Sequence, residues 1–207
     1  MRLLLEKERP VLYTGGGVIL SGAAALLTEF ARILGLPVTT TLMGLGGFPG
    51  TDPLSLGMLG MHGTFRANMA ISHCDVILGM GARFDDRVTG KIDEFAPGAK
   101  IIHVDIDPTS IQKNVPVNIP IVGDLKDVLR KMIKIVKGTK EAAQYRKKIA
   151  PWRDQIEKWK STHPLAYKQG KGRIKPQYVV EEIARVTGGD AIVVAGVGQH
   201  QMWASQF

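Results

Sequence analysis

Three glycines follow the first predicted strand, at the position that a nucleotide-binding turn occupies in many α/β domains. Residues 10–14 are largely apolar, and Gly15, Gly16 and Gly17 come directly after them. Because glycine has no Cβ, such a turn lets the backbone and its amides approach a ligand closely. A plain tight turn explains the triplet equally well, and the triplet is not the Gly-x-Gly-x-x-Gly fingerprint of nicotinamide-binding domains. The triplet alone leaves both interpretations open.

Two arginines follow a second apolar run, residues 75–80. Arg83 and Arg87 flank the dipeptide Asp85-Asp86 after an intervening Phe. Guanidinium groups at the end of a strand suit a diphosphate, which they hold by paired hydrogen bonds. Alternatively, the two aspartates pair with the arginines on the surface. Spacing does not decide between these interpretations.

Acidic residues follow a third run, residues 100–105. Asp105 at a strand end suits the hydroxyls of a ribose, whereas Asp107 before Pro108 is also typical of a helix cap. His62 lies between glycines in an accessible loop, where a histidine is most often simply solvated. The sequence contains no metal-ligand cluster, nucleophile elbow or Walker phosphate loop. These residues predict a dinucleotide-type site spread over several strand ends, with the cofactor undetermined.

Strands that are apolar throughout, alternating with helices, predict an α/β fold with a doubly wound parallel sheet. The predicted strands are 10–14, 36–42, 75–80, 100–105 and 119–122, and the predicted helices are 23–34, 64–73 and 125–137. Ser21 is the expected cap of the first helix and Gly35 its end. Residues 43–63, rich in glycine and proline, are expected to form a functional loop. In such sheets ligands bind beyond the carboxyl ends of the strands.

The character of the sequence changes after Gly138. Apolar residues at 145, 149, 152, 156 and 159 predict one basic helix that docks on a neighbouring domain. A helix over 176–186 with buried Val179 and Ile183, a strand over 190–195 and a helix from about Gln199 predict the start of a second sheet. Because one strand and one helix cannot bury their own faces, this part is expected to be truncated. The predicted domains are 1–138, a connector 139–175, and 176–207.

The charge of the chain is unevenly distributed. The formal net charge of its 207 residues is +8, and residues 126–175 hold 16 Lys and Arg against 4 Asp and Glu. Because this excess lies on predicted amphipathic helices and a polar connector, without interleaved aromatic residues, it indicates a solvated face and not a nucleic-acid site. The single cysteine, Cys74, is expected to be buried and inert. With no membrane span and no export signal recognised, the expected location is the cytoplasm.

Five stretches carry a family resemblance: residues 9–17, 59–64, 81–90, 103–108 and 198–203. The strings Gly-Ala-Arg-Phe-Asp-Asp-Arg and Gly-Gln-His-Gln-Met-Trp, in this order, are the most specific. With them the sequence resembles the large, catalytic subunits of acetolactate (acetohydroxyacid) synthases, which depend on thiamine diphosphate. The resemblance spans nearly the whole chain, is weakest over 140–175, and corresponds to the middle domain and the entry to the third.

This resemblance implies that the middle domain binds FAD in extended form. The implied contacts are Gly15, Gly16 and Gly17 through their amides; Thr41, Leu42, Gly60, Met61 and His62 near the flavin; Gly81, Ala82, Arg83, Asp85 and Arg87 around the diphosphate and ribityl chain; and Asp105, Ile106 and Asp124 toward the adenosine. FAD undergoes no net redox change in the family's reaction, so its implied role is structural.

The resemblance also implies that Val197, Gly198, Gln199 and His200 contact the diphosphate of thiamine diphosphate. The implied reaction decarboxylates pyruvate and joins the product to pyruvate or 2-oxobutanoate, for branched-chain amino acid synthesis. The implied assembly is a homodimer or homotetramer, with a possible small regulatory subunit. The family usually has an acidic residue where Gly196 stands, which leaves the local geometry open.

The family's activating glutamate and its Mg²⁺-holding Gly-Asp-Gly…Asn segment are not found in these 207 residues. We therefore expect this polypeptide alone to be inactive, with no catalytic or metal-binding residue of its own. Two alternatives remain from other classes. One is a different thiamine-diphosphate-dependent 2-oxo acid lyase or oxidase, and the other is a non-catalytic nucleotide-binding module.

Overall fold

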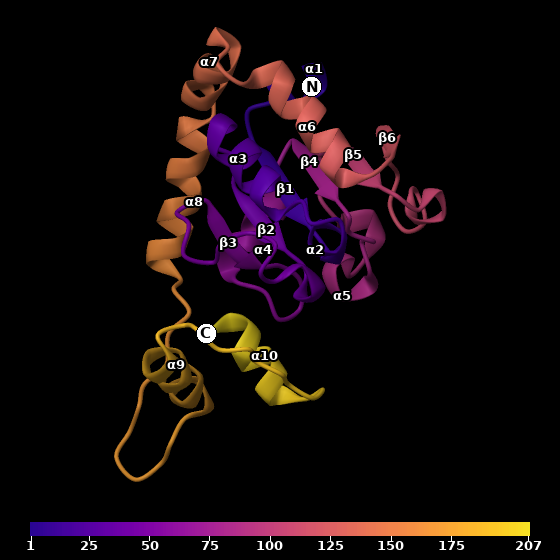
Figure 1. The fold of residues 1–207 in the computed structure, drawn as a ribbon. Helices are drawn as coiled ribbons and strands as arrows, with labels where there is room; N and C mark the ends of the chain where they lie inside the picture. The colour runs from indigo at the N-terminus through magenta and orange to yellow at the C-terminus, as the bar shows by residue number, and fades with distance from the viewer. The chain divides into compact units, whose positions relative to one another are not determined.

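The computed structural model describes all residues, from Met1 to Phe207, in two compact units. The first unit is Met1–His163 and the second is Pro164–Phe207. Figure 1 shows the first unit as a sheet surrounded by helices. The first unit extends past residue 138 and includes helices that the sequence pattern assigned to a connector. No helix of either unit has the length and apolar character that crossing a membrane requires.

The first unit is built on a six-stranded sheet in which every neighbouring pair of strands is parallel. The strands are β1 (Pro10–Thr14), β2 (Val38–Thr40), β3 (Ser55–Met58), β4 (Val76–Met80), β5 (Lys100–Asp105) and β6 (Ile119–Val122). Their spatial order is β3-β2-β1-β4-β5-β6. This is the order of the doubly wound dinucleotide-binding fold, so the predicted fold class is confirmed.

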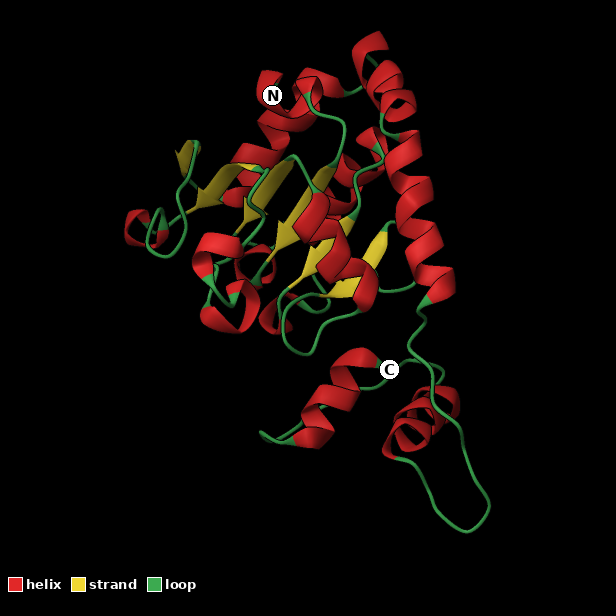
Figure 2. Cartoon of the chain, turned by 180° about the vertical axis from the view of Figure 1, so that it is seen from behind, coloured by secondary structure: helices red, strands yellow, loops and turns green.

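Helices cover both faces of this sheet (Figure 2). The helices of the first unit are α1 (Arg2–Glu6), α2 (Gly16–Leu20), α3 (Ala24–Leu34), α4 (Phe65–His73), α5 (Asp86–Thr89), α6 (Leu125–Val136), α7 (Lys140–Lys148) and α8 (Ala150–Thr162), with short 3-10 turns η1 (Leu42–Gly44), η2 (Ile92–Glu94) and η3 (Pro108–Ser110). Successive side chains of a strand point to opposite faces, so the sheet has two cores. Leu12 of β1 lies in one core, and its neighbours Val11 and Tyr13 lie in the other.

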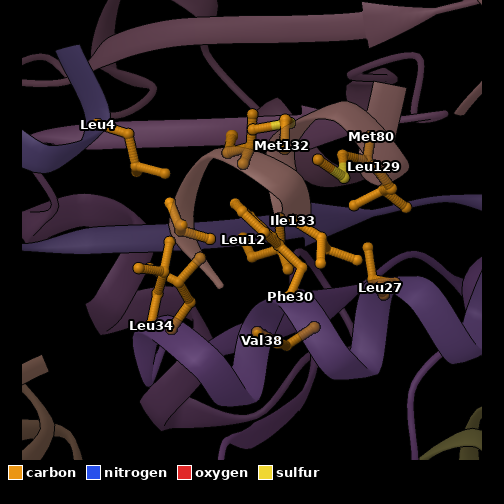
Figure 3. Packing of buried hydrophobic residues seen from close by; sticks show 14 of the residues in the cluster. Leu4, Leu12, Leu27, Phe30, Leu34, Val38, Met80, Leu129, Met132 and Ile133 are labelled. Carbon is orange, nitrogen blue, oxygen red and sulfur yellow. The ribbon is translucent and has the colours of Figure 1, made fainter. Parts of the chain in front are cut away.

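The first core joins α3 and α6 to the sheet. Phe30 and Leu34 of α3 and Leu129 and Ile133 of α6 meet around Leu12 (Figure 3). The second core lies under α4 and α8 and includes Cys74. The Cys74 thiol donates to the carbonyl of Ile71 at 3.1 Å, and burial raises its pKa to about 12. The expectation of a buried thiol is therefore confirmed.

Gly16 and Gly17 begin helix α2, so the triplet is more than the plain tight turn that one of its two interpretations describes. Two local predictions in the first unit are wrong. Ser21 does not cap α3; its amide ends α2 by donating to the carbonyl of Gly17, and α3 starts after Ala23. Residues 43–63 are not a continuous loop, because they include strand β3. Gly57 lies inside β3 with φ of +77°, next to a register shift against β2, and an interior glycine hides the strand pattern.

The apolar stripe after Gly138 lies on two helices and packs within the first unit. Helix α7 ends before Ile149, and α8 carries Pro151 in its first turn, where the missing N–H is tolerated. A proline within one continuous helix would clash with the preceding turn, which explains the break. Trp152 is buried in the second core, and its Nε1 donates to the carbonyl of Pro10 at 3.0 Å. The stripe therefore docks on its own sheet and not on a neighbouring domain.

The second unit contains two helices, α9 (Pro176–Thr187) and α10 (Gln199–Gln206). Both were expected from the sequence, and α9 ends at Gly188 in the left-handed conformation. The strand expected over 190–195 is absent, because the unit contains no second strand to pair with it. Val179 and Ile183 are exposed, against the expectation that they are buried. No sheet within this unit covers them.

Candidate functional site

A cleft opens where the order of the sheet reverses, between β1 and β4. Because all strands are parallel, the residues that follow β1, β2 and β4 meet at one edge of the sheet. They form a cleft with a volume of 510 Å³. Its walls are Tyr13, Gly15, Gly16, Thr41, Leu42, Met43, Gly81, Ala82, Arg83, Asp85, Asp86, Arg87 and Val88. The structure therefore brings together nine of the residues named as candidates from the sequence.

The turns after β1 and β4 touch through their backbones. A Cβ on Gly15 would lie 2.1 Å from the carbonyl oxygen of Gly81, and one on Gly17 would lie 2.7 Å from the Cα of Gly81. The amides of Gly15 and Gly17 already donate to the carbonyls of Met80 and Gly81, at 3.0 and 3.2 Å. Gly16, at the start of α2, keeps an amide without a protein acceptor. Of the three amides, only that of Gly16 is available to a ligand, and the other two glycines permit the close approach.

The two arginines of the cleft pair with the neighbouring aspartates. An Nη of Arg83 donates to Asp85 at 2.8 Å, and Nε of Arg87 lies 4.0 Å from Asp86. All four side chains are substantially exposed, so these pairs contribute little to stability and exchange partners readily. Local pairing, one of the two interpretations of this motif, is present. It leaves both guanidinium groups at the cleft wall, where an anionic ligand can compete for them.

The loop that carries the arginines is anchored by Phe84. This residue has φ of +54°, a conformation that few residues other than glycine adopt, and its side chain is 1% exposed. Its ring packs edge-to-face on Tyr13 and His103, with centroid distances of 5.0 and 5.1 Å. Gly79 of β4 makes room for the ring, because a Cβ there would lie 2.8 Å from Cζ of Phe84. Strain in the backbone is thus held by packing beneath the cleft.

Two buried polar side chains lie below this loop. The hydroxyl of Tyr13 has no hydrogen-bond partner, and the ring of His103 has only a poorly aligned contact with the backbone of Ala82. Burial, and secondarily the charge of Asp85, raises the pKa of Tyr13. Burial lowers the pKa of His103, although the backbone of Ala82 and then Asp105, 3.9 Å away, act in the opposite direction. Tyr13, which lines the cleft, is therefore neutral at physiological pH and adds no charge to it.

Other candidate residues lie next to the cleft without lining it. Gly60, with φ of +90°, and Met61 lie against the arginine loop, where the amide of Met61 donates to the carbonyl of Arg87 at 3.0 Å. Gly17 and His62 are likewise outside the lining. The candidates from the sequence did not include Tyr13, Met43, Asp86 and Val88, which do line it. An aromatic residue one position before a strand end was the available signal for Tyr13.

The acidic candidates also lie at strand ends. Asp105 ends β5, is nearly buried, and accepts from the amide of Asp107 at 3.0 Å, while Ile106 is exposed. Asp107 caps η3, as the alternative interpretation of that motif predicted. Asp124 caps α6 by accepting from the amide of Lys126 at 2.8 Å. One oxygen of Asp124 is thus engaged in stabilising the helix.

The candidates for a second phosphate site lie in the second unit. Gly198 precedes α10 as its N-cap, and Gln199 and His200 form the first turn of the helix. Val197 is 94% exposed. The first amides of α10 have no partner within the helix, which is the arrangement that binds anions. All four residues therefore lie next to one another at the start of α10, within the second unit.

Comparison with known proteins adds the family context. Residues 1–132 match the family described as "Thiamine pyrophosphate enzyme, central domain". The chain is 47% identical over 207 residues to the acetolactate synthase large subunit of Buchnera aphidicola, covering 36% of that protein. It is 49% identical over 207 residues to acetolactate synthase 1, chloroplastic, of Zea mays, covering 32%, and 48% identical over 205 residues to the large subunit of Haemophilus influenzae, covering 35%. The chain thus spans about a third of the length of these relatives.

Proposed function

Because the chain belongs to the thiamine pyrophosphate enzyme family, we propose that it forms part of an acetolactate synthase large subunit. The complete enzyme would condense two molecules of pyruvate, or pyruvate and 2-oxobutanoate, with loss of CO₂. Identity near one half to several acetolactate synthases, over the full chain, supports this proposal over another thiamine-dependent lyase or oxidase. In branched-chain amino acid synthesis the product would be 2-acetolactate or its ethyl homologue.

The role proposed for the first unit is to hold FAD in the cleft between β1 and β4. The donors there suit a dinucleotide: a free amide at Gly16, the hydroxyl of Thr41, and the guanidinium groups of Arg83 and Arg87. These groups would bind and orient the diphosphate, and Asp105 at the next strand end would face the ribose. FAD itself would act as a structural brace, without net redox change. The observation that carries the proposal is this donor set at the switch point of the sheet.

Binding would require the arginine pairs to rearrange. In the structure Arg83 contacts Asp85, so an incoming diphosphate would replace a carboxylate as the acceptor. Since the pair is exposed, this exchange costs little. Phe84, which lies between Arg83 and Asp85 in the sequence, is buried. It would keep the loop in place while the guanidinium group of Arg83 turns. The loop would therefore supply positive charge without unfolding.

Removing the two guanidinium groups tests the proposal directly. We expect the purified chain to take up added FAD and become yellow. In the variant Arg83→Met/Arg87→Met the affinity should fall by at least about a hundredfold, since two charged hydrogen-bonding groups are removed and each contributes about 1.5–3 kcal/mol. Flavin fluorescence titration measures both values. The control is Arg130→Met, which removes an exposed arginine from α6 outside the cleft.

The second unit is proposed to contact thiamine diphosphate and not FAD. The residues proposed for this are Val197, Gly198, Gln199 and His200, at the start of α10. Mg²⁺ and the activating glutamate would come from other parts of the enzyme, so we propose that these 207 residues alone do not convert pyruvate. A coupled assay for acetolactate on the purified chain tests this. The dimeric or tetrameric state and a regulatory subunit are proposed for the complete enzyme alone.

A further inference from the structure

A second pocket lies at the opposite edge of the sheet from the cofactor cleft. Pro37 directly precedes β2, and residues 52–54 directly precede β3, so this pocket adjoins the amino ends of these strands. Helices α3, α7 and α8 complete its walls, and its volume is 590 Å³. Cavities of this size hold small molecules. A ligand here would not share a wall with the FAD cleft, which is formed by residues at the carboxyl ends.

Three arginines from three different helices converge on this pocket. They are Arg32 of α3, Arg146 of α7 and Arg153 of α8. Arg32 is oriented by Asp52, a buried carboxylate that accepts from Nε of Arg32 at 2.8 Å and from the amide of Leu54 at 2.9 Å. Asp52 is thereby fully engaged. The remaining N–H groups of Arg32 have no protein acceptor.

The other two arginines are held by carbonyl groups, which do not neutralise their charge. Nη1 of Arg146 donates to the carbonyl of Arg32, and Nη2 of Arg153 donates to the carbonyl of Arg146 at 3.2 Å. Neither has a carboxylate within 4.0 Å, although Asp154 and Glu157 also line the pocket; Glu157 pairs with Lys160 instead. Burial, and then the nearby charge of Arg146, lowers the pKa of Arg153. The charge of Asp154 acts in the opposite direction on this pKa, although Asp154 makes no ion pair with Arg153. Two positive charges therefore stand close together, each without a directly bonded carboxylate.

The fold keeps Arg153 in this position. Gly35 ends α3 in the left-handed conformation, with φ of +70°, and a Cβ there would lie 2.2 Å from Nη1 of Arg153. Contact with the end of α3 is favourable for a cation, because helix carbonyls carry partial negative charge there. That contact uses few of the five N–H donors of each arginine. The pocket also has an apolar wall beside the arginines, formed by Leu54, Leu56 and Ile156. Contact between the arginines and the end of α3 does not account for this wall.

We propose that this pocket binds a small phosphorylated molecule with an apolar body. The forked donors of Arg146 and Arg153 match the paired oxygens of a phosphate, and Arg32, whose charge Asp52 balances, adds further N–H donors. The leucine and isoleucine side chains would cover the apolar part of the ligand. The proposal is independent of FAD, because the two sites share no residue.

Titration of the full chain with phenyl phosphate tests this assignment. Amide NMR signals of residues in the pocket, such as Arg32, Leu54 and Arg153, should shift and saturate in the millimolar range or below. Inorganic phosphate should bind at least about tenfold more weakly, because it lacks the apolar group. Benzoate should also bind more weakly, because a carboxylate carries one charge. No saturable shift at these residues, or equal affinities for phenyl phosphate and phosphate, would overturn the proposal.

Matched variants separate the two sites. Arg146→Met/Arg153→Met should weaken phenyl phosphate binding at least about tenfold, whereas Arg83→Met/Arg87→Met and Arg130→Met should leave it unchanged. If the pocket variant does not fold, as judged by its thermal midpoint, Arg146→Lys/Arg153→Lys retains the charge and removes the fork, and should still weaken binding several-fold. Undiminished binding by a folded pocket variant would contradict the proposal. Loss of binding in the cleft variant would place the ligand in the FAD cleft instead.

Discussion

Phe84 shows how one buried side chain fixes the loop that borders the cleft between β1 and β4. Its neighbours Arg83 and Asp85 are exposed, so without an anchor the loop would be free to move. The ring of Phe84 fills a space between Tyr13, Phe95 and His103, all in edge-to-face contact with it. A left-handed backbone at a bulky residue costs about 1–3 kcal/mol and persists only when its surroundings fix it. Packing of the Phe84 ring therefore fixes the backbone of the loop that carries the two arginines.

Gly79→Ala tests this anchoring. The added Cβ would lie 2.8 Å from Cζ of Phe84, and the ring has no free space into which to move. We expect the free energy of unfolding to fall by about 1–3 kcal/mol. In a Phe84→Leu background, where the ring is absent, the same substitution should cost much less. Urea denaturation of the four proteins in this cycle measures the coupling. Gly98→Ala, whose Cβ would have its nearest contact at 3.9 Å, is the control.

His103 predicts a pH dependence of stability. Burial lowers its pKa from the ordinary value of 6.5, so between the two values the unfolded chain binds a proton that the folded protein does not. The contribution of His103 to the free energy of unfolding is therefore fully present above pH 6.5. It is lost as the pH falls toward the pKa of His103 in the folded protein, by at most about 1.4 kcal/mol per pH unit. His103→Gln should flatten the free energy of unfolding between pH 7 and pH 5. An unchanged slope would show that His103 titrates normally.

The sequence predicted the kinds of residue at the site better than their bonding. Glycines, arginines and aspartates after strands can be recognised in the sequence, and seven of them line one cleft. It was not visible that the amides of Gly15 and Gly17 are used within the sheet, because their acceptors lie 65 and 64 residues away along the chain. The role of Tyr13 was hidden for a similar reason. Its contacts depend on which residues the next parallel strand brings beside it.

At the scale of elements, periodicity predicted most strands and helices within one or two residues. It failed where one residue interrupts a pattern, as Gly57 does in β3 and Pro151 does at the start of α8. It also failed where an element needs a partner: residues 190–195 have the composition of a strand, but no second strand lies in their unit. Local sequence reports propensity, whereas hydrogen bonding across a sheet depends on the rest of the fold.

We expect helix α8 to contribute to the stability of the first unit, and Trp152→Ala tests this. The indole is buried beside Ile156 and bonds to the carbonyl of Pro10, which begins the central strand β1. Removing it should lower the free energy of unfolding by about 3–5 kcal/mol. Lys158→Ala, an exposed position on the same helix, should cost less than about 0.5 kcal/mol. Similar small effects for both would indicate that α8 only touches the sheet loosely. Chemical denaturation followed by circular dichroism distinguishes these results.

At the scale of the whole molecule, the basic excess lies mainly on the helices that follow β6, and the rest lies in the non-helical segment between α8 and α9. Leu129 and Ile133 of α6 face the core, while Arg130 and Lys134 on the same helix are exposed. Some of these cations pair with acidic residues nearby, as Lys137 does with Glu29 at 2.7 Å. The same separation continues on α7, where Tyr145 is buried and Arg146 is exposed. The pattern is that of amphipathic helices with a solvated basic face.

The two units should differ in stability, because they differ in what they bury. The first has two apolar cores, whereas Ile192 and Val194 in the second are 96% and 90% exposed. Amides of residues 190–197 should therefore exchange with solvent at nearly the rate of an unfolded peptide, while those of β1 and β4 exchange only through global unfolding. A chain of residues 1–163 should keep both the thermal midpoint and the FAD affinity of the full chain. Hydrogen exchange by mass spectrometry and a melting curve test this, with Trp152→Ala as a variant that lowers the midpoint in both lengths. Strong protection at 190–197, or a large loss of stability on shortening, would show that the second unit is ordered by contacts beyond its own residues.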